Sequence, residues 1–341
     1  MKKWVAVLAA GVISVSFSQA FGQVSKVDDV KKALSTENKD TVCWVHGGAL
    51  NIGLNEGFLH NWAAGGEIAS MAINSIFNGY LTYYHHNFVW TNNLDMKYGL
   101  NYAFSNDFVP RKTDDQLDFT SKFGSQVKKR KGLYYTALLN FKSQFTHGFD
   151  YSMTDWSHKP TSGLFSPAYT TVAAGLEYRK GSKLTLFYSP IAARATFVDA
   201  VYTSMSKTGA FGVDSGKTQK YEFGSYFTGR YMVELSKVMS FNTRLDLYSN
   251  YLAKDTRDAN GNLVKSDNPG NIQVFWDNLL TWKATKWLGL TVGFTVAYNN
   301  DNPYSKTYLT GGVVTDKNQP GENLGWIQIK QSIAFGLTYK F

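Results

Sequence analysis

The chain has 341 residues, a formal net charge of +9 and 43% hydrophobic residues, and 16% of its residues are aromatic. Its 21 tyrosines, 23 phenylalanines and 9 tryptophans are more rings than a soluble enzyme of this size usually carries, yet the mean hydropathy is only -0.27. A lipid-facing barrel with a polar lumen is expected to have this composition. The one cysteine, Cys43, excludes an internal disulfide.

The first 20 residues have the layout of a secretory signal peptide. Lys2 and Lys3 precede an apolar run that extends from Trp4 to about Phe17, and small residues follow. We expect cleavage after Ala20, or alternatively after Gly22. No later apolar run approaches the roughly 18 to 20 residues of a membrane helix.

A polar tail covers residues 21–41. Its spaced apolar residues predict one short amphipathic helix in Ser25 to Ser35. The tail could fold in the periplasm, plug the lumen or be disordered, and the sequence does not choose.

From residue 42 onward, apolar and polar residues alternate with the period of two that places them on opposite faces of a strand. Together the strands predict one transmembrane antiparallel barrel over residues 42–341, with about 12 strands and with 10 or 14 as alternatives. The clearest strands are Phe88 to Phe104, Leu133 to Phe145, Leu288 to Tyr298 and Trp326 to Phe341. Weaker ones are Cys43 to Leu54, Glu67 to Tyr83, Gln116 to Ser125, Pro167 to Arg179, Lys183 to Ala195, Lys220 to Glu234, Ser240 to Tyr251 and Asn271 to Ala284.

The connections between these strands alternate in length. Outer-membrane barrels combine short periplasmic turns with longer extracellular loops, so the alternation favours such a barrel over a soluble sandwich. Only Pro190 lies inside a predicted strand, where we expect a bulge. The short connections are Tyr84 to Asn87, Gln126 to Lys131, Lys180 to Ser182, Leu235 to Met239 and Thr285 to Lys286. The long ones are Asn55 to Gly66, Ser105 to Asp115, Thr146 to Ser166, Thr196 to Gln219, Leu252 to Gly270 and Asn299 to Leu324.

Several motifs, taken in their order along the chain, resemble an uncharacterised family of Bacteroidetes outer-membrane proteins, known as a domain of unknown function. The motifs lie at residues 61–67 (NWAAGGE), 111–115 (RKTDD), 141–145 (FKSQF) with Gly148, 165–169 (FSPAY), 189–190 (SP) and 209–213 (GAFGV). The resemblance runs from about Trp44 to the C-terminus. It implies an outer-membrane location and supplies no catalytic or binding residues.

Catalytic and metal-binding patterns are weak. Some outer-membrane phospholipases place a histidine and a serine two residues apart on one strand, and none of the six histidines has a serine two residues later. Asp255, Asp258, Asn260 and Asn262 match only part of a calcium loop, and the closing glutamate is missing. We therefore expect no enzyme activity, no metal and no cofactor.

Charged residues on the polar faces of the strands are candidates for the lumen lining. Both signs occur, whereas a pore that selects one class of ion tends to use one sign. Opposite charges should pair across a confined lumen, which predicts a narrow or filled interior. The candidate lumen charges are Asp95, Lys97, Asp118, Lys122, Lys142, Glu222, Arg230, Glu234, Arg244, Asp246, Lys330 and Lys340.

Two basic groups are candidate contacts for lipid phosphates or an acidic partner. Arg111 and Lys112 are predicted to lie in an outer loop, beside Asp114 and Asp115. Lys128, Lys129, Arg130 and Lys131 are predicted to form a periplasmic turn. Solvated turn residues are the plainer interpretation of both groups.

The sequence thus predicts an integral outer-membrane barrel that acts as a non-enzymatic structural or partner subunit of an outer-membrane assembly. A diffusion channel for a small solute is the alternative, and a lipid-acting enzyme is a remote one. The expected partners are outer-membrane lipids, including lipopolysaccharide, and other outer-membrane or periplasmic proteins. Nucleic acid is excluded by this location.

Overall fold

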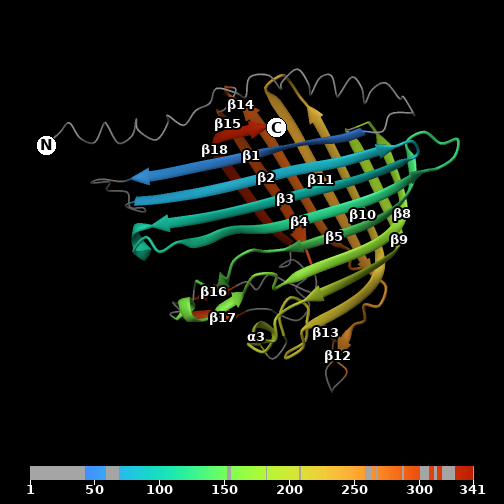
Figure 1. Ribbon diagram of the computed structural model, residues 1–341. Coiled ribbons are helices and arrows are strands. Elements are labelled where there is room, and N and C mark those ends of the chain that lie inside the picture. Colours follow the sequence, from blue (N-terminus) through green and yellow to red (C-terminus); the bar gives the residue numbers. More distant parts are fainter. Residues whose placement is uncertain are drawn as a thin grey trace, which may run out of the picture.

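Twelve long antiparallel strands close into one barrel in the computed structural model (Figure 1). The structure describes residues 43–58, 69–151, 155–181, 183–206, 209–257, 261, 263–265, 268–285, 288–299, 307–310, 313–316 and 327–340. Around the ring the order is β1, β18, β15, β14, β11, β10, β9, β8, β5, β4, β3 and β2. The strands are β1 (Cys43–Phe58), β2 (Ala69–His85), β3 (Phe88–Ala103), β4 (Arg111–Gln126), β5 (Leu133–Ser143), β8 (Ala168–Lys180), β9 (Leu184–Phe197), β10 (Gln219–Glu234), β11 (Met239–Asn250), β14 (Gln273–Lys283), β15 (Leu288–Tyr298) and β18 (Ile327–Lys340).

The prediction of a closed antiparallel barrel with 12 strands is confirmed. Each predicted strand corresponds to one strand of the ring, and β1 pairs with β18 to close it. Figure 1 shows β1 to β4 on the near wall and β10, β11, β14, β15 and β18 crossing behind them. The predicted signal peptide and the tail at residues 21–41 lie outside the described residues, as does most of the partial calcium loop at residues 258–262.

Two boundary predictions were wrong. β1 extends to Phe58, through the first four residues of the predicted connection Asn55 to Gly66, and β4 begins early. Arg111 and Lys112 do not lie in an outer loop, because β4 begins at Arg111, five residues before the predicted start. The register between β3 and β4 shifts so that Gly99 pairs with Asp114 but Leu100 pairs with Lys112. This bulge reverses the alternation of faces, so a period-two pattern cannot follow the strand through it.

The expected irregularity at Pro190 is confirmed. The register of β9 shifts against β8 between Ala174 and Leu176, and β10 shifts in the same region. Pro190 has no N–H to donate to the ladder, which is why the bulge forms there. The Ser189 hydroxyl instead donates to the Ala174 carbonyl at 2.6 Å. At Gly175 a Cβ would lie 2.0 Å from the Tyr188 carbonyl oxygen, so the bulge requires glycine.

The two faces of the wall differ in polarity. Large apolar side chains point outward and are exposed, as at Ile329 (66%), Tyr135 (63%) and Ile191 (60%). Polar side chains on the other face are buried, including Asp118 (1%) and Glu177 (0%). An ordinary soluble protein has the opposite distribution.

The long connections carry the small elements of the fold, while the short turns occupy the other end of the barrel (Figure 1). The connections after β5 and β9 are tied together, since the Asp199 amide donates to the Ser166 hydroxyl at 2.8 Å. None of the described helices is both long and apolar enough to span a membrane. The small elements are β6 (Gly148–Phe149), β7 (Pro160–Ser162), α3 (Ala200–Thr203), the hairpin of β12 (Thr256–Arg257) and β13 (Leu263–Lys265), the hairpin of β16 (Thr307–Thr310) and β17 (Val313–Asp316), and 3-10 turns at Phe104–Asn106 and Trp156–His158.

Candidate functional site

Ion pairs cross the interior of the barrel between strands that are not neighbours. Arg230 on β10 contacts Asp95 on β3 at 2.9 Å. Four strands of the ring separate β3 from β10 on one side and six on the other, so the two side chains must meet inside the barrel. Lys97 on β3 contacts Asp277 on β14 at 3.0 Å, across the same number of strands. These charged side chains therefore form ion pairs across the lumen from one wall to the other.

Arg244 on β11 is the centre of this network. Its Nη1 lies 2.9 Å from Asp118 on β4, and its Nη2 lies 2.9 Å from Asp246 on its own strand. Lys142 on β5 contacts the Asp246 carboxylate at 2.9 Å and the Asp118 carboxylate at 3.6 Å. The Asp118 side chain is 0% exposed and that of Arg244 is 10% exposed. Two cations thus share two buried carboxylates, which is the compensation that buried charges require.

Neutral polar groups complete the hydrogen bonding of the buried carboxylates. Asn140 donates to Asp118 at 2.7 Å, and Thr228 donates to Asp246 at 2.7 Å. The Asn78 amide donates to Asp95 at 2.8 Å. With these bonds the network is both paired and hydrogen-bonded, so it fixes its side chains in one arrangement.

A second group of charges lies nearer the short turns. Glu177 on β8 pairs with Lys122 on β4 and, at 2.9 Å, with Arg179 on its own strand. The Thr136 hydroxyl donates to the same carboxylate at 3.1 Å, and Arg179 also donates to Thr91 on β3 at 3.0 Å. This group joins β3, β4, β5 and β8 on the inside of the wall.

Nearer the long loops, Lys330 on β18 contacts Asp114 on β4 at 2.6 Å, again across the lumen. Glu222 on β10 accepts a hydrogen bond from Asn250 at 3.0 Å and contacts Lys220 at 3.5 Å. Ion pairs thus occur at three levels of the barrel.

Apolar side chains fill part of the interior beside the charges. Phe187 is 0% exposed, and its ring centroid lies 6.4 Å from that of Tyr226. The Arg194 guanidinium lies 3.6 Å from the centroid of the Tyr248 ring, in a cation–π contact. The buried apolar cluster on β5, β8, β9, β10 and β11 contains Leu138, Ala173, Phe187, Ala192, Tyr226 and Tyr248. Buried apolar and aromatic side chains therefore occupy the lumen beside these five strands.

The structure brings most of the predicted lumen charges into these ion pairs. The sequence interpretation missed five residues that complete them, one of which is Lys220, the partner of Glu222. Glu177 was readable from the alternation, because it lies between the outward residues Leu176 and Tyr178, whereas Asp277 has an outward neighbour, Trp276, on one side only. No such alternation marked the other two residues. Arg179 lies one residue before the end of β8, and Asp114 lies at the register shift between β3 and β4. Glu234 is exposed at the short-turn end of β10, and the Lys340 side chain lies outside the described residues.

The two basic groups have different surroundings. Lys112 contacts Asp115 at 2.8 Å and donates to the Thr146 carbonyl at 3.0 Å, and Arg111 lies 5.3 Å from the Tyr151 ring centroid. Both side chains therefore fasten the connection after β5 to the barrel. Lys128, Lys129, Arg130 and Lys131 are exposed in the turn between β4 and β5. Their assignment to lipid phosphates stays a prediction.

One histidine has a carboxylate and a serine nearby. In the connection after β5, His158 Nδ1 lies 3.0 Å from Asp155 and 3.2 Å from the Ser157 hydroxyl. A catalytic triad requires the two ring nitrogens to serve different partners. Here both contacts fall on Nδ1, and the His158 side chain is 81% exposed. This arrangement cannot relay a proton from the serine.

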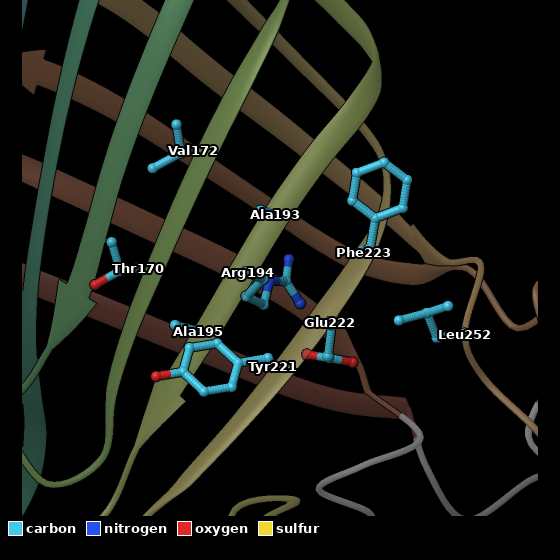
Figure 2. A pocket seen from close by; sticks show the side chains of 9 residues that line it. All are labelled: Thr170, Val172, Ala193, Arg194, Ala195, Tyr221, Glu222, Phe223 and Leu252. Atoms are coloured by element: carbon cyan, nitrogen blue, oxygen red, sulfur yellow. The ribbon is translucent and has the colours of Figure 1, made fainter.

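The outer wall has a shallow hollow of about 310 Å³ over β8, β9 and β10 (Figure 2). It forms where Ala193 and Ala195 lie between the larger Val172, Tyr221 and Phe223. The lining is mostly apolar and lies on the outward face, and Arg194 and Glu222 also border the hollow.

Comparison with known proteins gives structural matches of low identity. The COG4313 outer membrane channel from Pseudomonas putida F1 is 9% identical, with a TM-score of 0.35, over 89% of this chain and 97% of that chain. The translocator domain of autotransporter NalP from Neisseria meningitidis is 11% identical, with a TM-score of 0.29, over 93% of this chain and 95% of that chain. No curated protein matches the sequence.

A family model described as a protein of unknown function, DUF3078, matches residues 54–149. That segment contains the motifs at residues 61–67, 111–115 and 141–145, which carried the resemblance noted from the sequence. Over residues 54–149 the chain is therefore similar to this uncharacterised family.

Proposed function

We propose that this protein is an integral outer-membrane β-barrel with a closed lumen, which acts as a non-enzymatic structural or partner subunit of an outer-membrane assembly. The membrane assignment is supported by the closed ring of strands, which leaves no unpaired edge, and by its exposed apolar exterior. Bacterial barrels of this kind are inserted in the outer membrane. The N-terminal sequence, with its signal-peptide layout, agrees with export.

The single observation that carries the closed lumen is the set of ion pairs between opposite walls. Asp95 with Arg230, Asp118 with Arg244 and Lys97 with Asp277 each join strands that four others separate. A diffusion channel needs a continuous aqueous path, and binding inside it must be weak enough for the solute to leave. Ion pairs that bridge the interior, with Asp118 and Arg244 buried and the other four residues half-buried, supply neither condition.

Single-channel conductance in a planar bilayer tests the closed lumen. The folded protein should give no steady conductance, both with and without residues 21–41, because side chains of the wall itself close the barrel. An open porin reconstituted in parallel shows that the bilayers report conduction. Steady conductance of the intact protein, or of the protein without its tail, would overturn the proposal and favour the diffusion channel.

Gentle purification from the native membrane tests the role as a subunit. A mild detergent should release the barrel together with at least one other protein at a fixed ratio, which mass spectrometry of the intact particle measures. Extraction in a harsher detergent serves as the control that dissociates such a particle. Recovery of the barrel alone under every mild condition would contradict the role.

A further inference from the structure

The two ends of the barrel differ strongly in charge. The five short turns and their flanking strand ends cover residues 85–88, 126–133, 180–184, 234–239 and 283–288, and contain nine basic residues against one acidic residue, Glu234. The long connections, residues 59–68, 104–110, 144–167, 198–218, 251–272 and 299–326, contain 12 acidic and eight basic residues. One end is therefore cationic and the other mildly anionic.

Backbone hydrogen bonds join the short turns into one continuous rim. The Gln126 amide donates to the Asn87 carbonyl at 2.7 Å, and the Arg179 amide donates to the Gly132 carbonyl at 2.7 Å. Further around the ring, Met232 donates to Lys183 and Lys283 donates to Val238, both at 2.8 Å. Each bond joins one short turn to the end of the neighbouring strand, close to the next short turn. The basic residues of the turns therefore form a row from β4 to β14. We call this row the cationic rim: Lys128, Lys129, Arg130, Lys131, Lys180, Lys183, Lys237 and Lys283.

The charges of the cationic rim are available to a ligand. Lys128, Lys129, Arg130, Lys180, Lys183 and Lys237 are exposed. Within the part of the chain that the structure describes, none of these six has an ion-pair partner. The lumen cations differ, since Arg244 and Lys122 are each paired with buried carboxylates. The rim therefore offers its charge outward.

A belt of aromatic side chains lies directly beside the rim on the outer wall. Each member is exposed and stands within three residues of its strand end at the short turns. Tyr and Trp in barrels concentrate at the level of the lipid headgroups. Three residues of strand span about 10 Å, so long basic side chains at the turns reach the same level. The belt contains Trp90, Phe123, Tyr135, Tyr178, Tyr231 and Trp282.

From this juxtaposition we propose that the cationic rim binds the phosphates of anionic phospholipids in the leaflet at the short-turn end of the barrel. The proposal rests on the barrel being a membrane protein. The position of the rim at the aromatic belt favours a lipid headgroup over an acidic protein, which would dock farther from the bilayer. Each basic residue near an anionic membrane surface contributes about 1 kcal/mol of attraction, which corresponds to about a fivefold change in the binding constant.

Competition between brominated lipids for quenching of tryptophan fluorescence tests the proposal, because Trp90 and Trp282 lie in the belt. The full-length protein in mixed bilayers should prefer brominated phosphatidylglycerol over brominated phosphatidylcholine by about fivefold or more, and 0.5 M salt should reduce this preference. The triple variant Lys128→Gln, Lys129→Gln and Arg130→Gln should lose most of it.

The matched control carries the same loss of three charges at the other end of the barrel, as Lys159→Gln, Lys217→Gln and Lys254→Gln. It should keep the preference. Equal binding of both lipids to the intact protein would overturn the proposal, and this result is expected if the natural ligand of the rim is an acidic protein. An equal loss of the preference in the two triple variants would also overturn it. Displacement of phosphatidylglycerol by lipopolysaccharide at the same site would overturn the assignment to phospholipid. Folding into the bilayers is checked separately by resistance to heat and detergent, so failure of the rim is distinguishable from failure of the barrel.

Discussion

Replacement of Arg244 by methionine tests the central network most directly. The side chain makes three charge-assisted hydrogen bonds, one to Asp118 and two to Asp246, at 2.9 to 3.0 Å. Such bonds are worth about 1.5 to 3 kcal/mol each by pairwise counting, which would give roughly 4.5 to 9 kcal/mol. The variant also avoids the desolvation of the guanidinium, which costs several kcal/mol.

The largest cost of the substitution comes from the carboxylate that it leaves behind. The Asp118 carboxylate is 0% exposed, and without Arg244 the one cation left within contact distance among the described residues is Lys142, at 3.6 Å. Removal of one partner from a buried pair typically costs about 3 to 5 kcal/mol. Because Lys142 compensates in part, we expect the free energy of unfolding to fall by about 3 kcal/mol, near the lower limit.

The assay is reversible urea unfolding of the protein in lipid vesicles, followed by tryptophan fluorescence. Lys254→Met, at an exposed position in the connection after β11, is the control and should change the free energy of unfolding by less than about 0.5 kcal/mol. In the double variant Arg244→Met with Asp118→Asn, the loss should be smaller than the sum of the single losses by about 1 kcal/mol or more. A loss below about 1 kcal/mol for Arg244→Met, or strict additivity, would refute the reasoning.

Two further predictions concern the packed interior and the bulge. Phe187→Ala should lower the free energy of unfolding by about 3 to 5 kcal/mol in the same assay, because the ring is 0% exposed within the lumen cluster. Leu186→Ala on the adjacent outward position should cost clearly less, and equal losses would mean that the lumen is not packed. Gly175→Ala should reduce the yield of heat-resistant folded barrel, because its Cβ would meet the Tyr188 carbonyl oxygen at 2.0 Å. Gly229→Ala, whose nearest neighbour would be the flexible Leu186 side chain at 3.2 Å, is the control, and a normal yield from both variants would contradict the tight bulge.

The positions of the strands follow from the sequence because alternation is a local property. Side chains one residue apart point to opposite faces, so Leu288 to Tyr298 shows its outward and inward sets without any knowledge of its neighbours. The lengths of the connections then indicate the ends of the barrel. The bulge at Pro190 was also predictable, because proline lacks a backbone N–H and so removes a ladder hydrogen bond at its own position.

Local patterns failed where the backbone leaves the regular ladder. The early start of β4 at Arg111 was missed because the bulge near Lys112 exchanges the two faces within one strand. The true partners of Arg111 and Lys112 were missed for the same reason. Their side chains contact Tyr151 and Asp115, which the connection after β5 and the shifted strand bring to them.

The sequence by itself determined that charges of both signs lie on inward faces, and that basic residues occupy the short turns. Only the tertiary structure decided that Arg244 meets Asp118, and that Lys97 meets Asp277. Those partners depend on the order, tilt and stagger of all 12 strands, which set the height of each residue around a closed ring. The continuity of the cationic rim also depends on the tertiary structure, because the pairing of adjacent strands from β4 to β14 places the successive turns side by side.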